Sequence, residues 1–267
     1  MLNLETLLLF IALGSVVGVA AGLLGVGGGG IIVPSLTTIF IMQGMPESEV
    51  VHMALGTSMA TIIVTSFASL RAHHKREGVL WNVVKMMAPG ILLGTFLGTF
   101  LASVLSSFYL AIFFSVFMAY VSLQMFLNKK PKPSRTLIAA SGQFGAGSII
   151  GAISALVSIG GGSLTVPYLI WQNVDIKKAI GTSAAVGFPI AVSGTLGYIV
   201  NGWSHTDMSQ FTFGYIYLPA FLIIACCSYF TAPLGVKLTH VLPINITKRI
   251  FAFLLIALSI KMLSSFI

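Results

Sequence analysis

The sequence predicts an all-α integral membrane protein built from two inverted-topology repeats of about five helical segments each. Three observations lead to this prediction: the composition, the length of the apolar runs and an internal repeat. Of the 267 residues, 57% are hydrophobic and only 7% are charged, whereas soluble domains carry roughly 25% charged residues. The composition therefore indicates a chain that lies mostly within lipid.

Long apolar runs predict the membrane-spanning helices. A helix needs about 20 apolar residues to cross a hydrocarbon core about 30 Å thick. The runs that approach or reach this length are 4–24, 51–70, 79–104, 109–127, 137–159, 180–200, 211–236 and 250–267. Barrel strands would alternate polar and apolar residues, and these runs do not. Because lipid offers the backbone no hydrogen-bond partners, the runs are expected to be helices.

An internal repeat is visible when Pro34 is aligned with Pro167. The segment GVAAGLLGVGGGGIIVP (18–34) then lies over GAISALVSIGGGSLTVP (151–167), and ALGTSMA (54–60) matches AIGTSAA (179–185) at a similar distance. Two matching blocks in the same order predict a duplicated unit. We expect a first transmembrane repeat over 1–127, a basic linker over 128–135 and a second transmembrane repeat over 136–267.

The distribution of Lys and Arg predicts the orientation of each repeat. Basic loops of membrane proteins face the cytoplasm, and the segments RAHHKREG (71–78) and NKKPKPSR (128–135) are the most basic loops. The loop 201–210 corresponds to 71–78 in the second repeat but has no Lys or Arg. We therefore expect 201–210, 43–50 and both termini outside, with the two repeats inverted across the cytoplasmic membrane.

The segment that follows each glycine run is too short to cross the membrane. At 1.5 Å per residue, 31–42 and 164–172 span roughly 15–18 Å, about half of the hydrocarbon thickness. We therefore expect two half-helices that begin at glycine breaks. Short, glycine-interrupted segments at matching places in two halves indicate the binding site of a transporter.

The glycine breaks supply most of the candidate substrate-binding residues. These are Gly27, Gly28, Gly29 and Gly30 in the first repeat, and Gly160, Gly161, Gly162 and Ser163 in the second. Glycine lets the backbone unwind and lets a ligand approach it closely. The start of a half-helix presents unpaired N–H groups and a positive dipole end, which favour an anion. Ser163 is placed to cap its helix or to donate its hydroxyl to the ligand.

Other small residues have a simpler interpretation. Glycines in membrane helices commonly allow close packing of one helix on another. We prefer this interpretation for two sets of glycines at four-residue spacing, Gly14, Gly18 and Gly22, and Gly90, Gly94 and Gly98. Four consecutive glycines at 27–30 exceed what packing requires, so the binding interpretation is kept for the breaks.

Polar residues within the predicted helices complete the candidate site. The GTS motif occurs in both repeats and supplies Thr57, Ser58, Thr182 and Ser183. Such hydroxyls either contact the ligand or bond back to their own helix, and both interpretations stay open. Gln143 lies inside the run 137–159, where an amide is expected to face protein or a cavity rather than lipid.

Several functional classes are disfavoured. The net charge of +8 is expected from cytoplasmic loops, so no nucleic-acid partner is predicted. Cys226 and Cys227 are adjacent and belong to no metal-binding or redox motif. All carboxylates lie in loops or at run ends, which leaves no buried acid–base pair; they are Glu5, Glu47, Glu49, Glu77, Asp175 and Asp207. We expect no enzyme activity, no cofactor and no metal.

The quoted motifs resemble those of the TauE/SafE family of sulfite exporters. The resemblance rests on GLLGVGGGGIIVP with ALGTS, SIGGGSLTVP with AIGTS, and the APG of 88–90, and it covers essentially the whole chain. One departure is Ser158 where the first repeat has Gly25. The resemblance implies transport of sulfur-containing oxyanions, with the glycine segments and GTS pairs as the site.

The expected function is therefore export of a small sulfur oxyanion such as sulfite, sulfoacetate or another organosulfonate. An anion channel and an uptake permease for thiosulfate or a sulfonate are the alternatives. The expected partners are this anion and the lipid bilayer, and a homodimer is left open. Because every carboxylate lies near an interface, we expect export to be driven by the membrane potential rather than by a buried proton relay.

Overall fold

The structure is a computed structural model that describes residues 3–24, 27–127, 136–238 and 244–266. Within these residues, the first half contains α1 (Leu4–Leu24), α2 (Gly29–Met42), α3 (Val50–His74), α4 (Trp81–Val104) and α5 (Ser107–Leu127). The second half contains α6 (Ala140–Val157), α7 (Gly162–Trp171), α8 (Ile176–Asn201), α9 (Leu218–Leu238) and α10 (Ile244–Ser264). Two short 3-10 helices, η1 (Trp203–His205) and η2 (Met208–Gln210), and a hairpin of β1 (Thr212–Phe213) and β2 (Ile216–Tyr217) connect α8 to α9.

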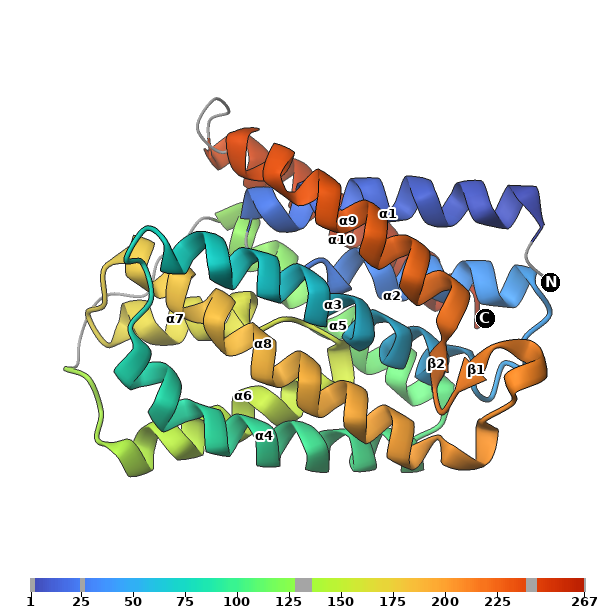
Figure 1. The fold of residues 1–267 in the computed structure, drawn as a ribbon, viewed down its shortest axis with the longest axis horizontal. Helices are drawn as coiled ribbons and strands as arrows, with labels where there is room; N and C mark the ends of the chain where they lie inside the picture. The colour runs from blue at the N-terminus through green and yellow to red at the C-terminus, as the bar shows by residue number, and fades with distance from the viewer. Residues whose placement is uncertain (1–2, 25–26, 128–135, 239–243, 267) are drawn as a thin grey trace.

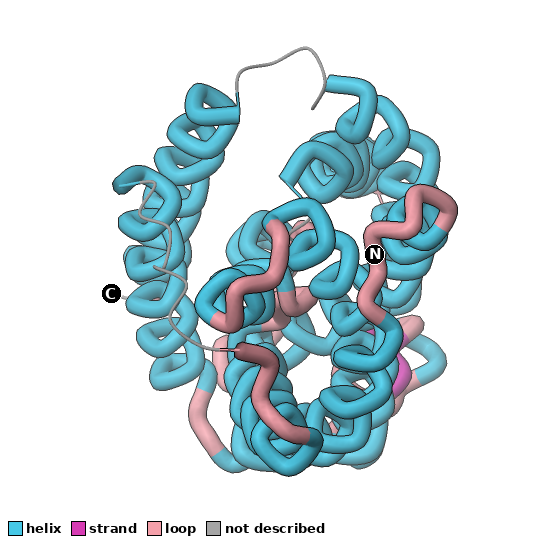
Figure 2. The backbone as a smooth tube through the Cα atoms, turned by 90° about the vertical axis from the view of Figure 1, so that its left-hand side faces the viewer, coloured by secondary structure: helices cyan, strands magenta, loops and turns pink. Residues whose placement is uncertain are grey.

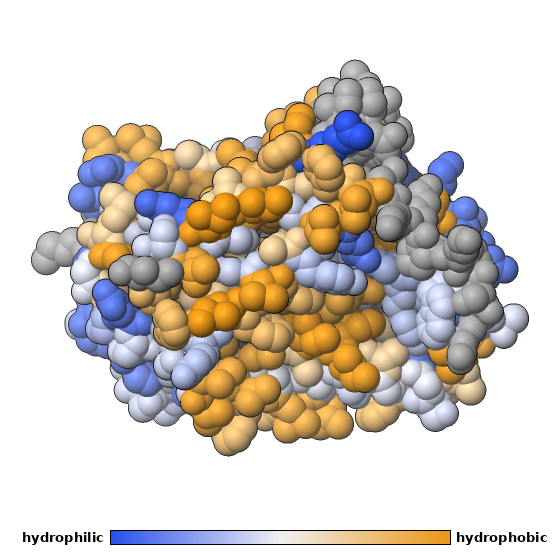
Figure 3. Space-filling view, turned by 180° about the vertical axis from the view of Figure 1, so that it is seen from behind, coloured by the Kyte–Doolittle hydropathy of each residue, from blue (hydrophilic) through white to orange (hydrophobic). Residues whose placement is uncertain are grey.

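The all-helical membrane fold is confirmed. Seven helices of the described chain are long and apolar enough to cross a bilayer. Most helices run along one common direction, and they are viewed nearly end-on in Figure 2. On the face drawn in Figure 3, apolar residues cover the middle and hydrophilic residues gather toward both ends. This distribution is expected of a protein whose central apolar band is surrounded by lipid.

Glycines allow two helix pairs to pack closely, as the sequence predicts. A Cβ atom built at Gly14 or Gly18 of α1 would lie within 3 Å of the α9 backbone. A Cβ at any of the glycines at 90, 94 and 98 of α4 would meet backbone carbonyls of α6 at comparable or shorter distances. These contacts leave no room for a larger side chain. Helices α1 and α9 therefore pack together, and so do α4 and α6.

Helices α3 and α8 lie side by side at the centre of the bundle and run in opposite directions (Figure 1). Both are largely buried. The pairings on either side have the same pattern, because α1 packs on α9 in the way that α6 packs on α4. The inverted relation of the repeats stays a prediction, and the linker 128–135 lies outside the described residues.

The segments that follow the glycine runs form two short helices, and α2 is somewhat longer than predicted. Helix α2 has 14 residues and α7 has 10, which at 1.5 Å per residue corresponds to about 21 and about 15 Å. Each begins near the middle of the molecule, and α2 and α7 extend toward opposite ends (Figure 1). Their first residues, Gly29 and Gly162, therefore lie at the depth where a substrate site is expected.

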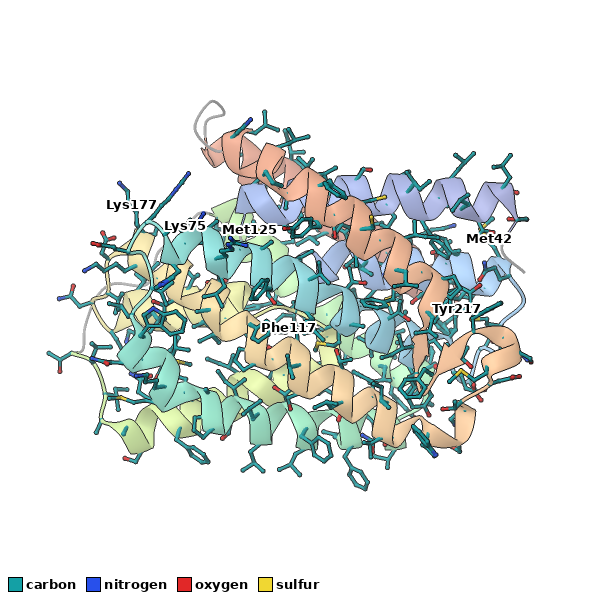
Figure 4. The ribbon with its side chains drawn as sticks, viewed as in Figure 1. Met42, Lys75, Phe117, Met125, Lys177 and Tyr217 are labelled. Carbon is teal, nitrogen blue, oxygen red and sulfur yellow. The ribbon has the colours of Figure 1, made fainter. Side chains whose placement is uncertain are left out.

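The two ends of the molecule differ in charge. Lys75 and Lys177 lie at one end, which we call the basic end, and Met42 and Tyr217 lie at the other (Figure 4). We call the second end the hairpin end because it carries β1 and β2. The loop between α3 and α4 and the loop between α7 and α8 lie at the basic end (Figure 1).

One part of the predicted helical run 211–236 is wrong. Residues 212–217 form the antiparallel hairpin, in which Thr212 pairs with Tyr217 and Phe213 with Ile216. Gly214 turns the chain with φ +57°, a left-handed conformation that glycine adopts readily. An apolar run does not by itself distinguish a strand from a helix. Helix α9 accordingly begins at Leu218.

Candidate functional site

The two glycine breaks adopt the same backbone conformation. Gly28 precedes α2 with φ +82°, and Gly161, its match in the alignment, precedes α7 with φ +79°. Both angles are left-handed, and a side chain at either position would strain the backbone. The matching glycines therefore make matching turns into the two half-helices.

The breaks touch each other at the centre of the protein. A Cβ atom built at Gly27 would lie 3.2 Å from Cα of Gly160. A Cβ atom at Gly29 would overlap the carbonyl oxygen of Ser158. Glycine is thus required at these positions because backbone packs directly on backbone. The structure brings the two predicted glycine segments together.

Ser158 replaces a glycine of the first repeat and still takes a left-handed conformation, with φ +48°. Its hydroxyl donates a hydrogen bond to the carbonyl of Leu55 on α3, at 3.3 Å. This bond ties the second break to α3. The matching Gly25 lies outside the described residues.

The threonines of the two GTS motifs hold the starts of other helices. Thr57 Oγ1 accepts a hydrogen bond from the N–H of Tyr217, just before α9, at 3.0 Å. Thr182 Oγ1 accepts one from the N–H of Leu80, just before α4, at 2.9 Å. First-turn N–H groups of a helix lack partners within the helix. Both threonines are fully buried, so each satisfies a donor that is out of reach of bulk water.

The glycines of the same motifs make room for these loops. A Cβ atom at Gly56 would overlap the carbonyl of Tyr215, and one at Gly181 would overlap the carbonyl of Gly78. The Gly-Thr pair of each motif therefore faces a helix-connecting loop. Thr57 and Thr182 have a structural role in these hydrogen bonds. Their predicted role in ligand binding stays a prediction.

The serines of the GTS motifs lie near the breaks. Ser58 lies on the α3 face between Leu55, which bonds to Ser158, and Ile62, whose side chain would meet a Cβ atom at Gly29. Its hydroxyl is buried and has no partner among the described residues. The Ser183 hydroxyl donates to the carbonyl of Ile180, while its own carbonyl would lie 3.4 Å from a Cβ at Gly161.

Ser163 does not cap its helix. The N-cap of α7 is Gly161, and no described side chain accepts a bond from the first turn. The Ser163 hydroxyl is itself buried without a partner in the described chain. The capping prediction is wrong because the cap position requires a left-handed glycine, and Ser163 is already the second helical residue.

Gln143 lies away from the breaks. It sits near the start of α6, about 20 Å along the helix from Val157 at 1.5 Å per residue. Its amide donates to Gln172 Oε1 at 2.8 Å and accepts from the Tyr168 hydroxyl at 3.1 Å. The residue therefore faces protein, as expected, and links α6 to α7. The structure does not bring it together with the glycine segments.

A cavity of about 290 Å³ connects the basic end to the two breaks. Gly27 and Gly160 line it at the depth of the breaks, and Arg76 and Lys237 line it at the basic end. Small residues of α1, α3, α8 and α9 form the rest of its wall: Ala21, Gly22, Thr65, Ser66, Ala68, Ser69, Ala72, Ala184, Ala232 and Pro233. A small solute can thus reach the glycine crossing through a basic mouth.

Packed aromatic rings lie on the α3 side of the hairpin end. Tyr215 stacks between His52 and His205, with ring centroids 5.1 and 5.0 Å apart. His52 lies only 4% exposed, and its Nε2 is 3.0 Å from the carbonyls of Ala102 and Leu105. The hairpin, which hydropathy did not reveal, covers His52 through Tyr215.

A second cavity, of about 240 Å³, lies beside these rings and is lined by Glu49, His205, Asp207 and Met53. His205 Nδ1 and Glu49 Oε1 are 3.0 Å apart. Hydrogen bonds from Ser209 hold the pKa of the Asp207 carboxyl below its ordinary value. The lining at this end is therefore acidic, in contrast to the basic mouth. No group of three potential metal ligands occurs among the described residues.

Broken half-helices that meet beside a solvent-reachable cavity indicate the class: a polytopic helical membrane transporter. Comparison with known proteins identifies the family. Residues 10–262 match the family described as Sulfite exporter TauE/SafE, and the chain belongs to this family of membrane transporters.

Relatives from distant organisms match most of the length of the chain. A probable membrane transporter protein of Haemophilus influenzae is 38% identical over 96% of this chain and 97% of its own length. One of Methanocaldococcus jannaschii is 26% identical over 87% of this chain and 86% of its own. The Bacillus subtilis probable membrane transporter protein YdhB is 27% identical over 85% of this chain and 87% of its own length. No solved structure matches the chain.

Proposed function

We propose that this transporter exports a small sulfur-containing oxyanion, such as sulfite, sulfoacetate or another organosulfonate, across the cytoplasmic membrane. The cavity carries the proposal. It combines a mouth lined by Arg76 and Lys237 with an inner end at the glycine crossing. Its volume of about 290 Å³ exceeds the roughly 30 Å³ that one water molecule occupies in the liquid several times over. A small anion can therefore enter with part of its hydration shell.

The charges at the mouth favour anions. Clefts lined by one sign of charge raise the local concentration of the opposite ion and its rate of association. Arg76 and Lys237 are exposed at the basic end, the end that the positive-inside rule assigns to the cytoplasm. The cavity in this structure then faces the compartment from which the anion is exported.

The membrane potential supplies the driving force in this proposal. Moving one negative charge out of a cytoplasm that is negative inside gains about 2.3 kcal/mol per 100 mV, and a dianion gains about twice as much. One such charge corresponds to a concentration ratio of more than tenfold. No buried carboxylate is required for this mechanism, which agrees with the position of all six carboxylates near interfaces or in loops.

A channel and an uptake permease for thiosulfate or a sulfonate are the competing functions. The glycine crossing favours a carrier, because backbone packed against backbone closes the path at the inner end of the cavity. A channel would conduct without saturation. Saturable flux with a defined KM therefore separates a carrier from a channel.

Transport in proteoliposomes tests the proposal. Vesicles loaded with labelled sulfite, thiosulfate or sulfoacetate are given a potassium diffusion potential, negative inside, at constant pH. We expect saturable efflux that this potential accelerates for at least one of the anions. An efflux rate that does not change with the potential but rises strongly with a pH gradient would instead indicate proton coupling. Absence of flux for all three anions would refute the proposed substrate class.

Variants at the mouth link the flux to the cavity. Arg76→Gln and Lys237→Gln are expected to raise KM for the anion about three- to tenfold at low salt, since each removes a charge at the mouth. The increase should shrink at high salt. Lys75→Gln is the control, because Lys75 lies at the same end but does not line the cavity.

A further inference from the structure

The two half-helices begin with the same backbone turn, but their surroundings differ in chemistry. In α7, Thr165 occupies the position that Ile32 occupies in α2, and Ser163 occupies the position of Gly30. The residues beside the glycine break therefore offer an anion hydroxyl groups in the second repeat, whereas those in the first repeat offer none.

Thr165 is the more informative of the two hydroxyl residues. It is fully buried, and its Oγ1 would lie 3.5 Å from a Cβ atom at Gly161, the N-cap of α7. This hydroxyl has no partner among the described residues. A buried hydroxyl without a partner destabilises the folded protein. A ligand that accepts a hydrogen bond at the helix start would remove this destabilisation.

Further donors point to the same place. The Ser163 hydroxyl is also buried and unpartnered in the described structure. No described side chain caps α7. The N–H groups of Leu164 and Thr165 bond to the Gly161 carbonyl, which leaves those of Gly162 and Ser163 for an anion, and the helix dipole adds a positive end. Two hydroxyls and two backbone N–H groups together match an oxyanion with three or four oxygen atoms.

The start of α2 lacks this chemistry. A Cβ atom at Gly28 would meet the Val17 side chain at 2.5 Å and the Ile32 side chain at 3.8 Å. A Cβ atom at Gly30 would meet Leu255 at 2.9 Å and the sulfur of Met118 at 3.2 Å. These side chains supply no strong hydrogen-bond donor. An anion placed here would meet backbone N–H groups like those of α7, but no hydroxyl of α2 would help to replace its lost hydration.

The cavity ends beside the start of α7. Its lining includes Gly160 and Ala184, the chain neighbours of Gly161 and Ser183. The Ser183 carbonyl would lie 3.4 Å from a Cβ at Gly161. The Thr165 hydroxyl is therefore close to Gly161, the residue that follows Gly160 of the cavity wall.

We propose that the oxyanion binds at the start of α7 alone, held by the hydroxyls of Thr165 and Ser163 and by the N–H groups of Gly162 and Ser163. The start of α2 serves as a backbone support packed in hydrocarbon. This proposal rests on the proposed function, since it assigns the binding site of the same anion. It predicts that the two repeats, although alike in backbone, contribute unequally to affinity.

Titration of sulfite into the purified protein in detergent tests the assignment. Thr165→Val is expected to raise the Kd for sulfite about tenfold or more, and Ser163→Ala about three- to tenfold. The melting temperature of Thr165→Val should stay equal or rise, because valine fills the same space without an unpartnered hydroxyl. Thr37→Val is the matched control on α2, whose buried hydroxyl bonds to the Val33 carbonyl, and its Kd should not change.

Each outcome separates this proposal from the one on which it rests. If the wild-type protein binds and transports sulfite and Thr165→Val and Ser163→Ala bind it equally well, the binding site at α7 is wrong and the transport function stands. If Thr37→Val weakens binding as much as Thr165→Val does, the inequality of the repeats is wrong. If the wild-type protein binds none of sulfite, thiosulfate and sulfoacetate, both proposals fail.

Discussion

The hydroxyl of Thr57 accepts a hydrogen bond from the backbone N–H of Tyr217, 160 residues further along the chain, at 3.0 Å. The bond joins the first half of α3 (Val50–His74) to the residue before α9. Thr182 of α8 makes the same bond to Leu80, before α4. Each central helix therefore fixes the position at which a helix of the other repeat begins.

The first prediction concerns this pair of bonds. Thr57→Val and Thr182→Val should each lower the free energy of unfolding by about 1–3 kcal/mol, because a buried N–H loses its acceptor. Thermal unfolding of the purified variants in detergent measures the effect. Thr61→Val is the control, since its hydroxyl only bonds back to the Thr57 carbonyl within the helix. An equal loss in all three would show that the bonds across the repeats have no special role.

The second prediction concerns the crossing of the glycine breaks. Gly29→Ala should abolish transport, because its methyl group would overlap the Ser158 carbonyl and push the breaks apart. Gly145→Ala in α6 is the matched control, since a Cβ there meets nothing within 4 Å. Both variants are compared by flux per correctly inserted protein. Normal flux in Gly29→Ala would mean that the crossing moves freely during transport.

The third prediction concerns the ring stack at the hairpin end. Tyr215→Ala should open a path to the cavity beside it, because the ring of Tyr215 fills the space between His52 and His205. A cysteine at Met53, which lines that cavity and is 5% exposed, should then react several-fold faster with a membrane-impermeant maleimide. Cys226 and Cys227 are replaced by serine in this background. Tyr229→Ala, which removes an exposed ring of α9, should leave the rate unchanged.

The fourth prediction concerns orientation. Single cysteines at Lys75, at the basic end, and at Ser204, at the hairpin end, should be labelled from opposite sides of the membrane, with Lys75 on the cytoplasmic side. Both residues are exposed, so impermeant reagents reach them. Labelling of both cysteines from one side would contradict the predicted orientation of the loops and with it the inverted repeat.

Much of the fold could be predicted because its signals are local. A run of apolar residues such as 4–24 predicts α1 (Leu4–Leu24) to the residue, since lipid requires every backbone group to bond within its own helix. The glycine runs predict where α2 and α7 begin, because only glycine takes the left-handed turn at Gly28 and Gly161 without strain. The hairpin before α9 escaped prediction because an apolar stretch fits a strand as well as a helix.

The sequence by itself determined the membrane class, the two short helices that follow the glycine runs and the resemblance to the family. Only the tertiary structure decided which polar groups have partners. It paired Thr57 with Tyr217 and Gln143 with Gln172, and it left Ser58 and Thr165 without partners among the described residues. Hydropathy and repeats depend on neighbours along the chain, whereas the partner of a buried hydroxyl depends on helices that meet in space.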